Sequence, residues 1–138
     1  MRYAIPDNKK LVHEQVIPVR WGDMDALRHL NNTTYFRYME TSRIDWMRSI
    51  GMDFEAEEGV VVLNAFCNFH QQIRYPADVL IKTYVSDLAR TTFESWSTME
   101  RVDQPGVVCA EGGSTIVWVN FREEKAAPVP GWLRALLG

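Results

Sequence analysis

The chain lacks several features by which common classes of protein are identified. It has two cysteines, Cys67 and Cys109, which lie far apart and form no Cys-x-x-Cys pair, so neither a zinc site nor a redox motif is indicated. Its most apolar stretch, residues 59–67, is interrupted by Asn64 and is far too short to span a bilayer. Residues 1–10 contain no apolar run of the signal-peptide type. We therefore expect a cytoplasmic protein with no membrane segment.

Strong charge and nucleotide-binding signatures are also absent. The 15 Lys and Arg residues against 18 Asp and Glu give a net charge of −3, which argues against a general nucleic-acid binder but leaves room for a local basic site for a phosphorylated ligand. No Gly-x-Gly-x-x-Gly or P-loop pattern occurs, so neither a Rossmann site nor a nucleotide triphosphatase is supported. Ser114 lies in a strand-like segment rather than in a Gly-x-Ser-x-Gly elbow, which argues against a serine hydrolase.

The composition indicates one folded domain, residues 1–138. A hydrophobic content of 46%, with 5 Trp, 5 Tyr and 6 Phe, is too rich for a disordered chain. Residues 32–50 are predicted to form one long helix, with Asn31 or Asn32 as its N-cap and Gly51 just after its end. Its expected buried stripe comprises Tyr35, Phe36, Met39, Trp46, Met47 and Ile50.

The other segments have strand character. Residues 13–21, 60–75, 79–88, 92–102 and 107–121 are predicted strands, because they are rich in β-branched and aromatic residues. Short turns between them favour antiparallel hairpins. Residues 123–130 are predicted to be a polar link and residues 131–137 a short terminal helix. The order predicts an α+β fold in which the long helix packs on an antiparallel sheet of about five strands, whose exposed edges favour association.

The segment from Arg20 to Tyr35 contains the candidate catalytic residues. Two carboxylates, Asp23 and Asp25, precede a helix N-terminus, which offers unpaired N–H groups and a partial positive charge. A carboxylate there can attack an acyl carbon or activate water, while the N–H groups stabilise the oxyanion. The alternatives are two solvated or capping acids, or a magnesium site, although phosphatases of that type need a larger domain with more distant acids and a lysine. His29 is either a proton shuttle or a loop-shaping residue.

Several motifs, in order along nearly the whole chain, resemble the hotdog-fold thioesterases of the 4-hydroxybenzoyl-CoA thioesterase-like group. They are Arg20-Trp21-Gly22-Asp23-Met24-Asp25, His29-Leu30-Asn31-Asn32, then Tyr35, Tyr38, Glu40 and Arg43, Gln72-Ile73-Arg74-Tyr75-Pro76-Ala77, Arg90-Thr91-Thr92-Phe93 and Val129-Pro130-Gly131-Trp132-Leu133. The resemblance implies a single hotdog domain that hydrolyses an acyl-CoA thioester to a free acid and coenzyme A.

The resemblance also implies roles for particular residues. Asp25 would be the general base or nucleophile, and the backbone N–H near Asn32 would bind the oxyanion. Tyr35 would line the acyl pocket, together with strands of a second subunit. Arg90, Thr91 and Thr92 would contact coenzyme A, because arginine binds phosphate in a bidentate fashion. The expected assembly is a homodimer or homotetramer, with no metal and no cofactor other than the coenzyme A of the substrate.

Two arginines and the function itself each have more than one interpretation. Many relatives have glycine just before the histidine, whereas this chain has Arg28, which would narrow the acyl site or contact an acidic substrate. Arg43 falls inside the apolar stripe, so a structural partner such as Glu40 is expected. The alternative functions are a non-catalytic acyl-CoA or acyl-carrier binding module, and a dehydratase or hydratase of the same fold. The acyl group, the thiol, the mechanism and the choice of dimer or tetramer stay undetermined.

Overall fold

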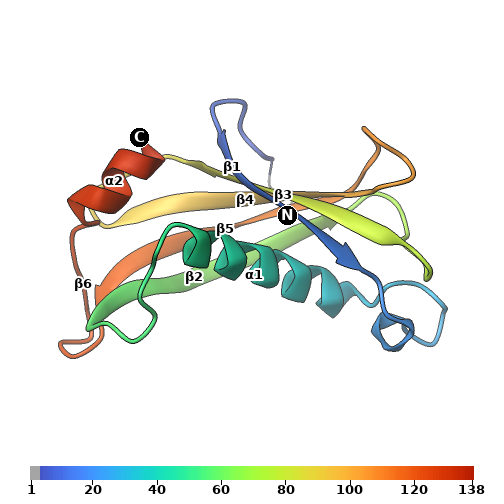
Figure 1. The fold of residues 1–138 in the computed structure, drawn as a ribbon, viewed down its shortest axis with the longest axis horizontal. Coiled ribbons are helices and arrows are strands. Elements are labelled where there is room, and N and C mark those ends of the chain that lie inside the picture. The colour runs from blue at the N-terminus through green and yellow to red at the C-terminus, as the bar shows by residue number, and fades with distance from the viewer. Residues whose placement is uncertain (1–3) are drawn as a thin grey trace.

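The computed structural model describes residues 4–138 as one sheet with a long helix across one face (Figure 1). The strands are β1 (Lys10–Pro18), β2 (Glu58–Phe69), β3 (Asp78–Ser86), β4 (Thr92–Arg101), β5 (Val108–Asn120) and β6 (Lys125–Ala126); the helices are the 3-10 turn η1 (Trp21–Asp23), α1 (Asn32–Ser49) and α2 (Gly131–Leu137). The sheet is antiparallel in the order β1-β3-β4-β5-β2, and β6 pairs with the end of β5. The predicted α+β architecture is confirmed, with β6 added inside the expected link.

Two predicted strands have the wrong bounds. The first ends at Pro18, because Trp21 begins η1 instead of extending the strand. The strand predicted over residues 60–75 ends at Phe69, because the following residues pair with the loop before α1. The carbonyl oxygen of Ile73 accepts a hydrogen bond from the N–H of Leu30 (2.8 Å), and both side chains are buried. This contact joins the segment before α1 to the segment before β3.

The ends of α1 form as the sequence predicts. Asn31 is the N-cap, and its side-chain oxygen accepts from the N–H of Thr33 (3.1 Å). Gly51 follows the helix with a φ of +83°, in the left-handed region that a glycine adopts without strain, and its N–H donates to the carbonyl of Arg48. The helix therefore has defined ends set by local hydrogen bonds.

The buried face of α1 is displaced from the predicted stripe. Phe36 was expected to be buried but is 36% exposed, whereas Tyr38 and Ser42 are buried. Both carry hydroxyl groups, so an apolar pattern omits them, but each hydroxyl finds a buried partner: Asp23 for Tyr38, and Thr83 for Ser42 (3.0 Å). Arg43 is half-buried, and burial lowers its pKa while the charge of Glu40 opposes that shift.

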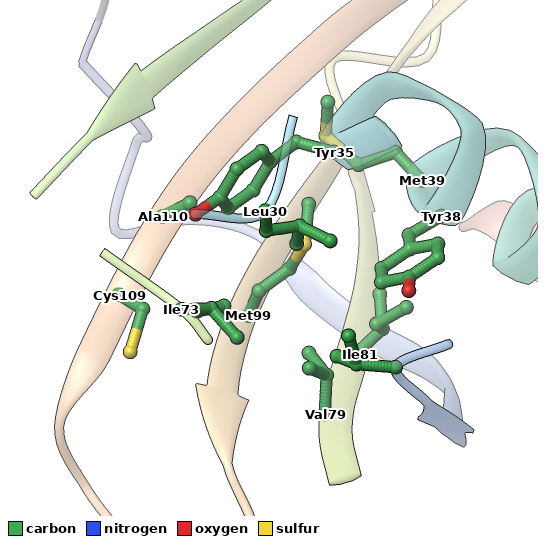
Figure 2. Packing of buried hydrophobic residues seen from close by; sticks show 11 residues of the cluster. Leu30, Tyr35, Tyr38, Met39, Ile73, Val79, Ile81, Met99, Cys109 and Ala110 are labelled. Carbon is green, nitrogen blue, oxygen red and sulfur yellow. The ribbon is translucent and has the colours of Figure 1, made fainter. Parts of the chain in front are cut away.

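The core between α1 and the sheet contains two clusters. Figure 2 shows the one nearest the start of α1, where Tyr35, Tyr38 and Met39 pack on side chains of β3, β4 and β5. The other lies under the end of α1 and beneath α2. Gly112 allows β5 to lie close to both β2 and α1, because a Cβ there would overlap the carbonyl oxygen of Phe66 and lie 3.0 Å from the sulfur of Met39.

The sheet ends in two outer strands, β1 and β2. On β2, three consecutive apolar residues are exposed: Val61 (39%), Val62 (40%) and Leu63 (60%). The prediction of exposed sheet edges is confirmed, and β2 is the more apolar of the two edge strands.

Candidate active site

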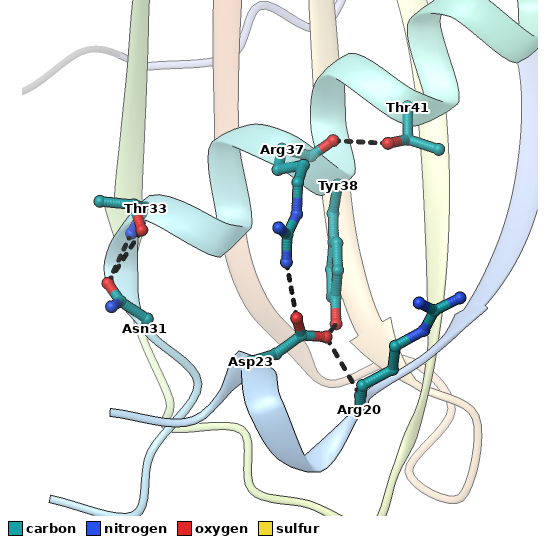
Figure 3. A network of polar contacts seen from close by, with 7 residues as sticks. All are labelled: Arg20, Asp23, Asn31, Thr33, Arg37, Tyr38 and Thr41. Carbon is teal, nitrogen blue, oxygen red and sulfur yellow. Dashed lines mark hydrogen bonds and ion pairs between the residues drawn. The ribbon is translucent and has the colours of Figure 1, made fainter. Parts of the chain in front are cut away.

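Asp23 anchors the loop before α1 to the helix. Its carboxylate accepts hydrogen bonds from the Tyr38 hydroxyl (2.6 Å), the Arg37 guanidinium (2.6 Å) and the N–H of Arg20 (3.1 Å), as Figure 3 shows. Burial by itself raises the pKa of Asp23, but the bonds from Tyr38 and the Arg20 N–H and the charge of Arg37 together bring that pKa below its ordinary value. The carbonyl of Asp23 also accepts from the N–H of Asn31 (3.0 Å), which fixes the loop against the helix start.

Asp25 lies in a tight turn that holds one of its carboxylate oxygens. Oδ1 accepts from the N–H groups of Leu27 (2.8 Å) and His29 (3.2 Å), and the Asp25 N–H donates to the carbonyl of His29 (2.8 Å). Within residues 4–138, Oδ2 of Asp25 accepts no hydrogen bond. The carboxylate is therefore oriented by one oxygen and has the other available to a ligand.

Arg28 occupies the strained position of this turn. Its φ is +64°, in the left-handed region that costs roughly 1–2 kcal/mol for a residue with a side chain. A glycine would adopt this conformation without that cost. The arginine nonetheless closes the turn, since its N–H donates to the carbonyl of Asp25 (3.1 Å).

His29 contacts an arginine from a distant part of the sequence. Its Nε2 lies 2.9 Å from Nη2 of Arg74. Because a guanidinium can only donate, Nε2 must be the acceptor, and the imidazole is neutral when this bond forms. The contact orients both side chains, whereas a role for His29 in proton transfer stays a prediction.

The first turn of α1 has an open donor. The N–H of Thr33 is satisfied by Asn31, but in the part of the chain that the structure describes no acceptor contacts the N–H of Asn32. This is the first residue of an 18-residue helix, where the partial positive charge of the helix is concentrated. An anionic oxygen would be stabilised at this position.

A cavity of about 460 Å³ lies beside Asp25. Its walls are Trp21, Gly22, Met24, Asp25, Arg28, Arg74 and Tyr75. The predicted site did not include the last two residues as ligand contacts or Trp21 as a wall. All three lie in the motifs that resemble the thioesterases, but those motifs assigned them no role in the site.

The other predicted substrate contacts lie elsewhere in the chain. Tyr35 is buried in the core rather than in the wall of this cavity; burial raises its pKa to about 12, and the charge of Asp25 adds to that rise. Arg90 and Thr91 form the turn before β4 beside α2, where the Arg134 guanidinium donates to the carbonyl of Arg90 (3.0 Å). In Figure 1, α2 and the η1 turn lie at opposite ends of the molecule. A single chain therefore does not bring the Arg90 turn, including Thr92, to Asp25.

Two other kinds of feature are absent from the described residues. Across residues 4–138, no helix is long and apolar enough to cross a membrane. In the same residues, no three His, Cys, Asp or Glu side chains gather as a potential metal-binding group.

Comparison with known proteins gives this arrangement its class. A solved structure of "a putative Thioesterase" from Pseudomonas aeruginosa is 36% identical, covers 94% of this chain and 100% of that chain, and superposes with a TM-score of 0.89. "A putative acyl-CoA thioesterase" from Xanthomonas campestris is 28% identical, with 80% and 95% coverage and a TM-score of 0.75. The fold and these likenesses define the class as the hotdog-fold thioesterase family. The sequence profile of the Thioesterase-like superfamily matches residues 19–137, and the chain belongs to that superfamily.

A curated relative is matched over a shorter stretch. A "Putative esterase" from Aquifex aeolicus is 29% identical over 79 residues, which are 54% of this chain and 62% of that protein. The chain thus matches less than two thirds of that relative's length. The resemblance to hotdog thioesterases inferred from the sequence motifs is confirmed by the profile and by the solved structures.

Proposed function

We propose that the protein hydrolyses an acyl-CoA thioester to a free acid and coenzyme A, with Asp25 as the catalytic carboxylate. The observation that carries the proposal is the arrangement of Asp25: one oxygen is held by two N–H groups, and the other is free beside a cavity. Water is the second substrate, and coenzyme A enters as part of the first.

The proposed reaction begins at the thioester carbonyl. Asp25 either attacks the carbonyl carbon or removes a proton from the attacking water, and both routes place negative charge on the carbonyl oxygen. The N–H of Asn32 would stabilise that charge, with help from the helix N-terminus. One such donor typically accounts for a factor of about 10² to 10³ in turnover.

The proposed assembly is a homodimer formed along β2, which can associate further into a tetramer. Among residues 4–138, β2 is an end strand whose one neighbour is β5, and it exposes Val61, Val62 and Leu63, so a second copy would extend the sheet and cover the apolar surface. Arg90 lies far from Asp25 in its own chain, so a contact between the Arg90 turn and coenzyme A would serve the site of the partner. Analytical ultracentrifugation of the full chain checks this: a monomer at micromolar concentration would contradict it.

The test of Asp25 is the release of free thiol from short, long and aromatic acyl-CoA esters. Asp25→Asn keeps the shape of the side chain and an oxygen that can accept from Leu27 and His29, so the turn should fold. We expect a loss of at least about 10²-fold in kcat for this variant. Asp53→Asn is the matched control, because Asp53 also accepts a local N–H bond but lies in an exposed loop after α1. Wild-type turnover in Asp25→Asn would reject the assignment.

The alternative is an acyl-CoA binding module, and one observation favours it. The two N–H bonds to Oδ1 of Asp25 are those that a purely structural capping acid would make. Equilibrium binding of acyl-CoA esters without thiol release, in protein shown to be folded by circular dichroism, would support this alternative over hydrolysis.

A further inference from the structure

Two arginines of the cavity beside Asp25 have no acidic partner. Arg28 and Arg74 both line the cavity, and no carboxylate among residues 4–138 forms an ion pair with either guanidinium. Arg37 and Arg101 form ion pairs with Asp23 and Asp103. Other arginines of the described residues, such as Arg48 and Arg90, also form no ion pair, so what distinguishes Arg28 and Arg74 is that they line the same cavity. The cavity lining holds these two guanidinium groups against the single carboxylate of Asp25, and the excess of positive charge attracts an anion. Arginine binds carboxylate oxygens with a rigid pair of donors.

The two side chains are positioned in different ways. Arg74 gives one N–H to Nε2 of His29, which holds the guanidinium in place and leaves its other donors available. Arg28 has its backbone held at a φ of +64° by the turn that also fixes Asp25. Arg28 and Asp25 therefore belong to one hydrogen-bonded loop, and Arg74 contacts that loop through His29.

The size of the cavity indicates which anion fits. Arg28, Arg74 and Asp25 line one cavity of about 460 Å³, so an anion bound by the arginines within it lies close to Asp25. The phosphates of coenzyme A are separated from the sulfur by the whole extended pantetheine arm, so phosphates bound there would hold the thioester away from Asp25. A carboxylate at the far end of a short acyl chain is separated from the thioester carbonyl by only a few methylene groups.

The remaining walls suit the carbon chain between the two groups. Trp21 is 77% exposed and Tyr75 is 48% exposed, and both rings border the cavity. Aromatic rings offer apolar surface to methylene groups without a polar partner being required.

We propose, resting on the thioesterase function above, that Arg28 and Arg74 bind a free carboxylate on the acyl group, so that the substrates are thioesters of short dicarboxylic acids. The arginines discriminate between substrates, while Asp25 and the helix N-terminus act on the thioester carbonyl. Carboxylate binding thereby gives a physical reason for an arginine at position 28, where a glycine would fold without strain.

The test compares adipyl-CoA with hexanoyl-CoA, which have the same six-carbon chain and differ in the terminal carboxylate. We expect wild-type kcat/KM to favour adipyl-CoA at least tenfold, and Arg74→Gln to remove most of that preference through a larger loss on adipyl-CoA than on hexanoyl-CoA. Arg28→Gly, which should fold without strain, is expected to act in the same direction. Arg122→Gln is the matched control, because Arg122 is an exposed arginine paired with Glu57 outside the cavity.

Pantetheine thioesters of the same two acids distinguish the acyl carboxylate from the phosphates of coenzyme A. If the arginines bind the carboxylate, the preference and its loss in Arg74→Gln persist without the phosphates. If Arg74→Gln weakens both CoA esters equally and leaves both pantetheine esters unchanged, the arginines bind phosphate and the proposal is overturned. Equal turnover of adipyl and hexanoyl esters by wild type would overturn it as well.

Measurements of binding without turnover distinguish this proposal from the proposed function. The S-hexyl thioether of coenzyme A and its 5-carboxypentyl counterpart cannot be hydrolysed, so calorimetry measures recognition without turnover. Tighter binding of the carboxylate compound by wild type, lost in Arg74→Gln, supports the arginine pair even if no thioester is hydrolysed. Equal affinity for both compounds overturns the pair even if Asp25 proves catalytic.

Discussion

Replacing Tyr38 by phenylalanine is expected to destabilise the fold through a single lost hydrogen bond. The Tyr38 hydroxyl donates to Oδ2 of Asp23 at 2.6 Å, and Asp23 is 8% exposed, so water cannot take over the bond easily. A hydrogen bond to a buried charged group contributes about 1.5–3 kcal/mol. Arg37 and the N–H of Arg20 still bind Asp23 in the variant, so we expect a loss near 2 kcal/mol, or on the order of 8 °C in Tm for a chain of this size.

The pH dependence of this loss is the sharper part of the prediction. The pKa of Asp23 is lower in the folded protein than in the unfolded chain, so its stabilisation is present above the unfolded pKa, near 4, and is lost as pH falls through the folded pKa. The difference in stability between wild type and Tyr38→Phe should therefore be full at pH 7 and smaller below about pH 4.

Urea unfolding followed by tryptophan fluorescence at pH 7, 5 and 3.5 measures this difference. Tyr84→Phe is the control, because its ring position over Lys9 is kept and, in the described part of the chain, its hydroxyl makes no hydrogen bond. A Tyr38→Phe variant within about 0.5 kcal/mol of wild type at pH 7, or a difference that does not shrink in acid, would refute the assigned role of Asp23.

Two further predictions concern packing and thiol reactivity. Gly112→Ala should lower the free energy of unfolding by at least about 3 kcal/mol or fail to fold, because its Cβ would overlap the carbonyl of Phe66. The control is Gly131→Ala, whose Cβ would have nothing within 4 Å and should leave Tm unchanged or slightly raised. Equal Tm values for the two variants in thermal denaturation would contradict this. Burial raises the pKa of Cys67 to about 12, so Ellman's reagent at pH 8 should label it only in urea, and rapid labelling of the native protein would show that the thiol is accessible as thiolate.

The helix and its ends were predictable because the interactions that set them are local. Asn31 and Gly51 act on residues within four positions, and the 3.6-residue period selects one face. The exact face was predicted less well, because Tyr38 and Ser42 are buried through hydroxyl partners on distant segments. An apolar pattern has no access to such partners, so it favoured Phe36 instead.

The candidate site also combines features that the sequence predicts with contacts that it does not. The sequence by itself determined the two carboxylates, the helix start that follows them and, through its motifs, the superfamily. Only the tertiary structure brought Arg74 to His29 across 45 positions and placed Tyr75 beside Asp25. It also separated the Arg90 turn from Asp25 within one chain. Spacing along a chain fixes periods and caps, whereas contacts between distant segments depend on how the helix and the strands pack.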